Sequence, residues 1–157
     1  MGVSKALKLI EFSAENYNDG KLEMDQIIVG PEDIRCVGEC EGKDSKDINI
    51  DKLRQLVEIL NADLYREEVT ERASGILFGN AQRLLDPDTR TLNFTDKCKK
   101  SAEREKIALV KTIDLYFVAR YLSENNDEGY KKTCREAIYH SFGKLVVFPK
   151  IPKSTEK

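Results

Sequence analysis

Three acids and a lysine close together are the residues of this chain best suited to chemistry: Asp25, Glu39, Glu41 and Lys43. Like charges set side by side cost stability unless a cation lies between them. Carboxylate and carbonyl oxygens are the only donors on offer, which favours Mg²⁺ or Mn²⁺ over Zn²⁺. If the fold brings these side chains together, they predict a metal site.

A β-hairpin would bring them together. The runs IIV and IRCV are typical of strands, and the Gly-Pro-Glu-Asp sequence between them forms turns. Pairing Val29 with Arg35 across a five-residue loop places Asp25 opposite Glu39, with Cβ atoms about 4.5–5.5 Å apart. The charged residues that follow share this face because strand side chains alternate. A four-residue loop would instead place Asp25 opposite Gly38.

The simplest alternative for this hairpin is an exposed ribbon with a ladder of solvated charges. Such a ribbon would need no ion. Against it, Gly42 and the apolar residues on either side favour strands that are covered on both faces. We therefore take the acids as a candidate site.

The composition predicts one globular domain. A chain of 157 residues can bury a core, and we expect a single domain over 1–150 with a flexible tail at 151–157. The formal net charge of −2 gives no indication of nucleic acid, although a groove can still be locally basic. The cysteines lack metal-site spacing, and buried, reduced thiols predict a cytoplasmic protein. No apolar run is long enough to span a membrane.

The other elements predict an α/β fold. A strand at 14–17 completes an antiparallel meander, and a helix at 50–67 leads to a short buried strand at 75–78. Because such crossovers are right-handed, that strand should lie parallel to the strand that carries Glu39. The remaining predicted helices are at 3–12, 94–106, from 112 onward and at 129–142. A strand is predicted at 107–110, and a strand or a strand-like edge at 144–148.

Two further groups of polar residues could reach the site. Arg54 and Gln55 flank the apolar stripe of the helix at 50–67, where simple solvent exposure is the ordinary alternative. Asn80, Gln82 and Arg83 follow the buried strand, at the carboxyl end where ligand sites of open α/β sheets gather. Such side chains contact phosphates and base edges, although polar loops are also common without any function.

Several other classes of site are excluded by missing residues. His140 is the only histidine, and no serine or cysteine lies in a nucleophile elbow, so a catalytic triad is not expected. Neither a GxGxxG sequence nor a P-loop is present. The chain also lacks a ligand set for zinc.

The order of these features resembles the PD-(D/E)XK nuclease superfamily. An aspartate on one strand, an acid and a lysine at the end of the next, a helix with a glutamine and a parallel strand cover roughly Leu22 to Asn80. The resemblance implies a restriction-endonuclease-like fold, which is a mixed sheet of an antiparallel meander and parallel strands flanked by helices.

The resemblance can be carried onto this chain in two ways. In the preferred alignment, Asp25 and Glu39 are the metal-binding acids, and Glu41 stands where the motif usually has lysine. Alternatively, Glu41 and Lys43 form the E-x-K motif itself, with Asp33 or Asp25 as the aspartate. We prefer the first because Glu39 lies deeper in the apolar strand and pairs with Asp25.

The resemblance implies a Mg²⁺- or Mn²⁺-dependent deoxyribonuclease. The metal held by Asp25 and Glu39 would polarise the scissile phosphate and activate a water molecule, which Lys43 or Glu41 would orient. Gln55 would complete the catalytic set. Contacts to the DNA backbone would come from Arg54, Asn80, Gln82 and Arg83.

The alternative is a nuclease-like module that binds nucleic acid or a protein partner without catalysis. Three departures from the superfamily pattern favour it: the Glu41 substitution, an N-terminal helix whose only glutamate is Glu11 at its end, and the acidic net charge. A homodimer, or a place within a larger multidomain protein, is compatible with either hypothesis.

Overall fold

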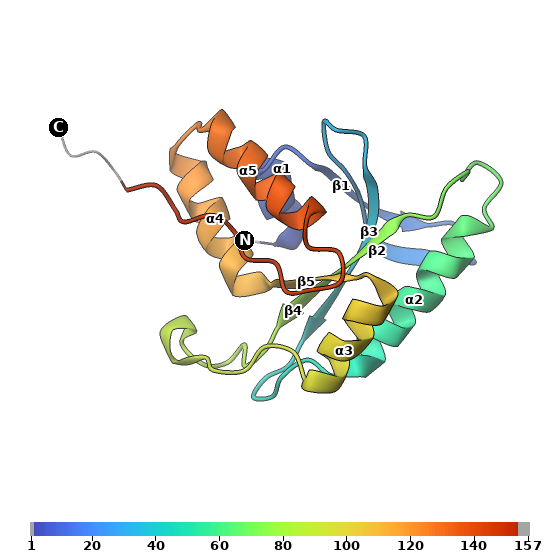
Figure 1. Cartoon of the computed structure of the whole chain (residues 1–157), viewed down its shortest axis with the longest axis horizontal. Helices are drawn as coiled ribbons and strands as arrows, with labels where there is room; N and C mark the ends of the chain where they lie inside the picture. The colour runs from blue at the N-terminus through green and yellow to red at the C-terminus, as the bar shows by residue number, and fades with distance from the viewer. Residues whose placement is uncertain (1, 154–157) are drawn as a thin grey trace.

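The structure is a computed structural model that describes residues 2–153 and contains one five-stranded sheet between two groups of helices (Figure 1). The strands are β1 (Ser13–Asn18), β2 (Glu23–Val29), β3 (Arg35–Gly42), β4 (Ser74–Asn80) and β5 (Ala108–Lys111). The helices are α1 (Val3–Leu9), α2 (Ile50–Leu64), α3 (Asp96–Glu105), α4 (Thr112–Glu124) and α5 (Glu128–Tyr139), with a short 3-10 turn, η1, at Pro87–Thr89.

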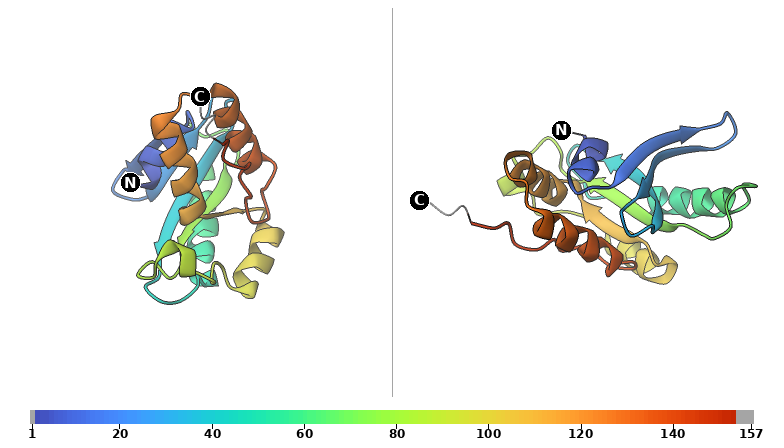
Figure 2. Two further views of the ribbon diagram at one scale, coloured as in Figure 1. Left: turned by 90° about the vertical axis from the view of Figure 1, so that its left-hand side faces the viewer. Right: turned by 90° about the horizontal axis from the view of Figure 1, so that it is seen from above.

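The sheet is mixed, as the sequence predicts. Its strands lie in the order in which they occur along the chain, so each strand pairs with the next. β1, β2 and β3 form an antiparallel meander, while β3, β4 and β5 are parallel. The turn between β1 and β2 projects from the body of the molecule (Figure 2). The predicted α/β class and the predicted parallel pairing of β3 with β4 are therefore confirmed.

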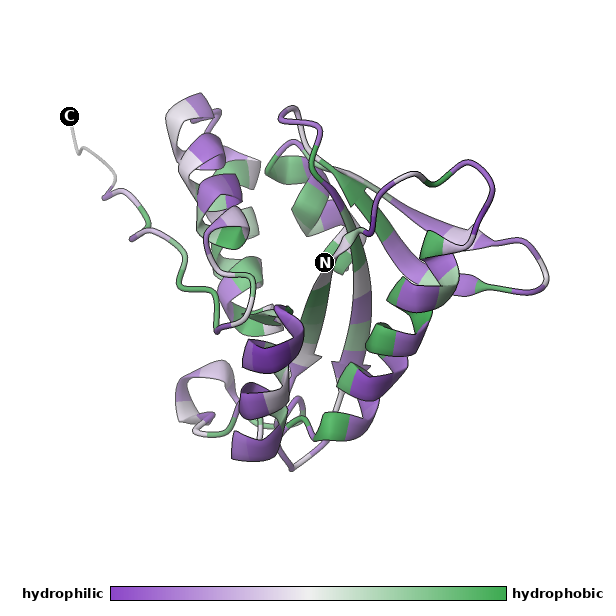
Figure 3. Cartoon of the chain, turned by 45° about the vertical axis from the view of Figure 1, so that its right-hand side comes forward, coloured by the Kyte–Doolittle hydropathy of each residue, from purple (hydrophilic) through white to green (hydrophobic). Residues whose placement is uncertain are grey.

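Alternating side chains of the central strands pack into two apolar layers, one on each face of the sheet. On β4, Ile76 and Phe78 pack into the layer covered by α1, α4 and α5, while Leu77 packs into the layer under α2 and α3. The helices turn their hydrophobic stripes toward the sheet (Figure 3). Burying side chains of this size stabilises the fold by about 1.5–3 kcal/mol each, which accounts for the apolar run of β4.

The last predicted element, a strand or a strand-like edge at 144–148, is not a regular strand. This segment makes a single parallel bridge, Leu109 with Leu145, and then runs on as irregular chain. A longer ladder cannot form because β5 passes directly into α4 after Lys111, while Pro149 has no N–H to donate.

The ends of three predicted helices also differ. The first helix stops at Leu9 rather than at residue 12, because Glu11 takes a left-handed backbone conformation with φ of 71°. α2 ends at Leu64, not at 67, and α5 ends at Tyr139, not at 142. Of the predicted tail, 151–153 is irregular and exposed, and 154–157 lies outside the described residues. Within the described part of the chain, no helix is long and apolar enough to cross a bilayer.

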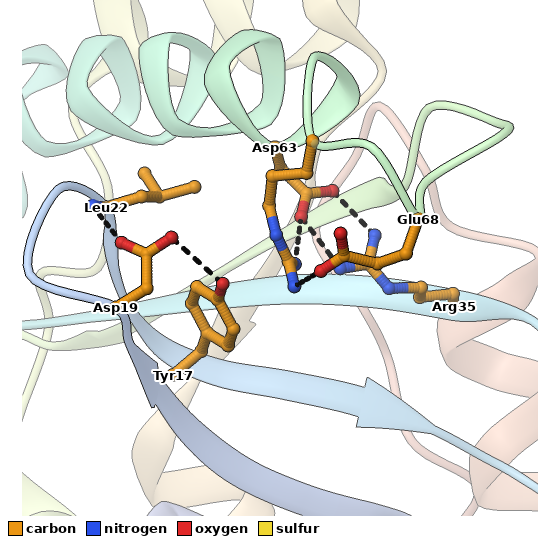
Figure 4. Close-up of polar contacts among 7 residues, drawn as sticks. Tyr17, Asp19, Leu22, Arg35, Asp63 and Glu68 are labelled. Atoms are coloured by element: carbon orange, nitrogen blue, oxygen red, sulfur yellow. Dashed lines mark hydrogen bonds and ion pairs between the residues drawn. The ribbon is translucent and has the colours of Figure 1, made fainter.

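A buried ion cluster fastens the start of β3 to the end of α2. Asp63 is fully buried and accepts two hydrogen bonds from the guanidinium of Arg35, at 2.6 and 2.7 Å (Figure 4). Arg66 donates a third at 3.0 Å and lies over the ring of Tyr17, 3.9 Å from its centroid. Burial opposes ionisation of Asp63, but these hydrogen bonds outweigh it and lower its pKa. The cluster anchors the end of β3 that lies away from Glu39.

Candidate active site

The hairpin has the register that places the two candidate metal acids opposite each other. Val29 pairs with Arg35 across a five-residue loop, and the backbone ladder runs as far as the pair Gln26 and Gly38. This confirms the predicted pairing and excludes the four-residue loop. At the next position, where Asp25 lies opposite Glu39, the ladder stops.

At this position carboxylate oxygens, in place of backbone carbonyls, accept the hydrogen bonds of the backbone N–H groups. The backbone N–H of Asp25 donates to Glu39 Oε2 at 2.9 Å, and the backbone N–H of Cys40 donates to Asp25 Oδ2 at 3.1 Å. The interruption coincides with a shift of register between β1 and β2, on the other side of Asp25. The two carboxylates are thus locked together by the strands that carry them.

The environment of Glu39 favours its protonated form. Its side chain lies under α2, and the residue is only 4% exposed. Burial, followed by the side-chain hydrogen bond and charge of Asp25, raises the pKa of Glu39 to about 7, against the hydrogen bond from the Asp25 N–H and the charge of Lys52, which lower it. A carboxylate pair of this kind binds a proton or a cation at neutral pH, because like charges in a poorly solvated site repel each other.

The two candidates for the third position, Glu41 and Lys43, pair with each other. The Lys43 ammonium lies 3.8 Å from Glu41 Oε1, and both residues are partly buried. Among residues 2–153, no group of three or more acids, histidines or cysteines is arranged to hold a metal ion. The structure therefore brings Asp25 and Glu39 together, whereas Glu41 pairs with Lys43.

Asp33 cannot supply the aspartate of the alternative alignment. It lies in the hairpin loop, exposed, with φ of 63°. Glu41 is eight residues further along the chain, which corresponds to about 26 Å in an extended strand. Only Asp25 remains as the aspartate in either alignment.

Lys52 is the site residue that the sequence analysis missed. It lies in the first turn of α2, and its charge lowers the pKa of both Glu39 and Cys40 against the larger effect of burial. Its position directly before the buried Leu53 was the available signal. Gln55 is exposed on the same helix, and Arg54 is exposed and pairs loosely with Asp51 at 3.8 Å.

The polar residues after β4 mainly hold their own loop. Asn80 Oδ1 accepts a hydrogen bond from Arg90, and Gln82 is buried with its side-chain oxygen accepting the backbone N–H groups of 91 and 92. Arg83 is half exposed and pairs with Asp44 at 2.6 Å. Of these residues, Arg83 has the side chain most open to a ligand.

Two other predicted features lie apart from the carboxylate pair. Glu11 forms an ion pair with Lys131 of α5 at 3.4 Å, so α1 contributes no acid to the pair. The four cysteines are free thiols, as expected. Burial and the nearby charges of Asp25 and Glu39 raise the pKa of Cys40 to about 12, which excludes a thiolate nucleophile at neutral pH.

Comparison with known proteins gives one structural similarity to report. The sequence matches no protein-family model and no curated protein sequence. The fold is similar to that of a repair endonuclease from Pyrococcus abyssi, with a TM-score of 0.46, 18% sequence identity and coverage of 65% of this chain. The match covers 39% of the endonuclease, so the chain corresponds to well under half of that protein.

Proposed function

We propose that this chain is a metal-dependent phosphodiester hydrolase of the nuclease type, acting on DNA at the pair formed by Asp25 and Glu39. The observation that carries the proposal is the interlocked pair of carboxylates formed by the buried Glu39 and the half-buried Asp25, with the pKa of Glu39 raised to about 7. Placing two carboxylates next to each other at a poorly solvated position lowers the stability of the fold unless a partner compensates their charge. A bound cation would offset that cost.

The donor set fits Mg²⁺ or Mn²⁺. Mg²⁺ keeps several of its waters and is commonly held by one or two carboxylates together with substrate phosphates. Asp25 and Glu39 would be the protein ligands, so the lack of a third acid in the described part of the chain is no obstacle. When bound, such an ion supplies Lewis acidity toward the phosphoryl group and lowers the pKa of a coordinated water.

The surrounding side chains would position the substrate. Lys52, whose charge acts on Glu39, and Lys43, which follows β3, would stabilise negative charge that develops on the phosphate. Glu41, held next to Lys43, would orient the attacking water. Arg54 on α2 and Arg83 on the loop after β4 are exposed enough to contact the DNA backbone, with Gln55 and Asn80 beside them.

A cleavage assay on linear and supercoiled DNA with Mg²⁺ or Mn²⁺ tests this proposal. Asp25→Asn and Glu39→Gln should each lower the rate by at least a hundredfold, because each removes a ligand of the ion. Asp33→Asn is the matched control, since it neutralises an exposed acid at the far end of the same hairpin and should leave the rate unchanged. Equal rates for all four proteins would refute the assignment.

A second candidate is a binding module without catalysis. In the preferred alignment Glu41 stands where the motif usually has lysine, and it is paired with Lys43 rather than with the carboxylate pair. Calorimetric titration with Mn²⁺ separates the two functions. A module that lacks catalysis would show no Mn²⁺ binding at millimolar concentrations, whereas the hydrolase would bind the ion and lose binding in Asp25→Asn.

A further inference from the structure

An open groove of about 720 Å³ lies at the β5 edge of the sheet, between the second half of α3 and the segment that follows α5. Its apolar floor consists of Leu109, Phe142 and Leu145. The segment after α5 passes next to both β5 and α3 (Figure 1, Figure 2). At Gly143, where φ is 108°, an added Cβ would lie 3.5 Å from the carbonyl oxygen of Glu103. The two walls of the groove are therefore in contact at this glycine.

The charged residues that line this groove are mostly basic. Lys99 and Lys106 come from α3 and its C-cap, and Lys144 and His140 come from the opposite wall. All four are exposed, and Glu103 is the only acid in the lining. Among residues 2–153, none of the three lysines forms an ion pair. Their charges are therefore available to an anionic ligand.

The backbone of Leu145 is an unpaired strand edge beside this groove. The N–H of Leu109 on β5 donates to the carbonyl of Lys144 at 3.0 Å, and the N–H of Val146 donates to the carbonyl of Leu109 at 2.8 Å. Because alternate residues bond across a parallel pair, the N–H and C=O of Leu145 point away from β5. Neither group has a hydrogen-bond partner in the described part of the chain. A further strand can add at this position.

Lysines near an exposed strand edge are ordinary, because they prevent edge-to-edge aggregation. That role accounts for Lys144, which adjoins the edge. It does not account for Lys99 and Lys106, which reach the same groove from α3. Lys106 also has a left-handed φ of 57°, a conformation that glycine adopts more readily, so backbone geometry does not favour lysine there. Two separate elements thus place lysines around one apolar floor, which indicates a ligand with acids beside an apolar group.

We propose that this groove binds an extended, acidic segment of a partner protein, which pairs with the backbone of Leu145 as an added strand. An apolar side chain of the segment would cover Leu109 and Phe142, and acids beside it would contact the lysines. A peptide is favoured over nucleic acid because it carries the repeating N–H and C=O groups that pair with a strand edge. The inference does not depend on the proposed hydrolase, whose carboxylate pair does not line the groove.

A displayed library of random twelve-residue peptides, selected on the whole chain, tests this proposal. The selected peptides should be enriched in aspartate and glutamate around a central apolar residue. The peptide that binds best, synthesised with a fluorescent label, should bind the double variant Lys99→Glu with Lys144→Glu at least tenfold more weakly than the wild type.

Two N-methylated forms of the same peptide test the strand edge without any change to the protein. Each form blocks the amide nitrogens along one edge of the extended peptide. The form blocked on the edge that faces Leu145 should bind at least tenfold more weakly than the unmodified peptide, and the other form should bind within about threefold of it.

The matched control is Lys21→Glu with Lys132→Glu, which makes the same change in net charge at exposed positions outside the groove. It should bind the peptide within twofold of the wild type. A lack of enrichment in acidic peptides, equal binding by the two double variants, or equal binding of the two N-methylated forms would overturn the proposal.

Two other occupants of the groove would each give a distinct result. A single-stranded DNA oligonucleotide that displaces the labelled peptide at a lower concentration than the unlabelled peptide would overturn the proposal in favour of nucleic acid. Self-association of the wild type in sedimentation, abolished by Lys99→Glu with Lys144→Glu, would overturn it in favour of a second copy of the chain. Failure of the cleavage assay would refute only the hydrolase and leave the peptide result standing.

Discussion

Asp25 and Glu39 are interlocked across β2 and β3: the N–H of Asp25 donates to the carboxylate of Glu39, and the N–H beside Glu39, on Cys40, donates to the carboxylate of Asp25. The two acids thus replace backbone acceptors at the point where the ladder ends. Their geometry is fixed by the sheet itself, which makes the pair rigid before any ligand arrives.

The stability of the metal-free protein should fall between pH 5 and pH 8 because of Glu39. Its folded-state pKa is raised to about 7, so the folded state binds a proton more tightly than the unfolded state. The contribution is therefore present below the unfolded pKa and is lost as the pH rises through 7. Urea unfolding in EDTA should show that the decrease in the free energy of unfolding between pH 5 and pH 8 is smaller by about 1–3 kcal/mol in Glu39→Gln than in the wild type.

The control for that experiment is Asp33→Asn, which should lose as much stability as the wild type over the same pH range. An identical pH dependence in Glu39→Gln and the wild type would mean that Glu39 does not titrate in this range.

Divalent metal should stabilise the protein at pH 8 more than at pH 5. At the lower pH a proton occupies the pair and competes with the ion, because the pKa of Glu39 lies near 7. Mg²⁺ at ten times its Kd should add about 1.4 kcal/mol of stability at the higher pH. Thermal unfolding with and without Mg²⁺ measures this gain. Asp25→Asn with Glu39→Gln should lose it, and a gain that survives in the double variant would place the ion elsewhere.

Asp63→Asn should destabilise the fold by about 3 kcal/mol, because it leaves the guanidinium groups of Arg35 and Arg66 without their buried partner. Because the pKa of Asp63 is lowered, its contribution is present at neutral pH and is lost as the pH falls through the folded-state pKa. Urea unfolding at pH 7 provides the measurement. Glu68→Gln, which removes an exposed ion-pair partner of Arg66, should change the free energy of unfolding little. Equal effects of the two variants would contradict a buried ion cluster.

Lys52→Met should raise the pKa of Glu39 further, because the positive charge that opposes burial is removed. Carboxyl ¹³C NMR titration measures this shift directly. If the chain is a hydrolase, cleavage should also slow by about a hundredfold, as expected when a group that stabilises developing charge is lost. Arg54→Met, two residues along α2 and exposed, is the control and should leave the titration unchanged. A titration unaffected by Lys52→Met would exclude that residue from the site.

Local patterns predicted most of the scaffold correctly. The strand runs and the turn between them predicted the hairpin and two possible registers, and the structure has the five-residue loop that pairs Val29 with Arg35. The parallel pairing of β3 and β4 followed from the handedness of the crossover. Whether 144–148 would be a full strand or a strand-like edge depended on how much of β5 remained free for pairing, and no local pattern records that.

The sequence by itself determined the α/β class and the hairpin, because these follow from short-range periodicity and turn chemistry. The structure decided between the two possible hairpin registers and so placed Asp25 opposite Glu39. Only the tertiary structure decided which other side chains act on that pair. Lys52 influences Glu39 because α2 packs over β3, while Gln82 is occupied inside its own loop and Glu41 by Lys43. Such choices depend on distances between segments far apart in the chain, and burial then sets the strength of each charge.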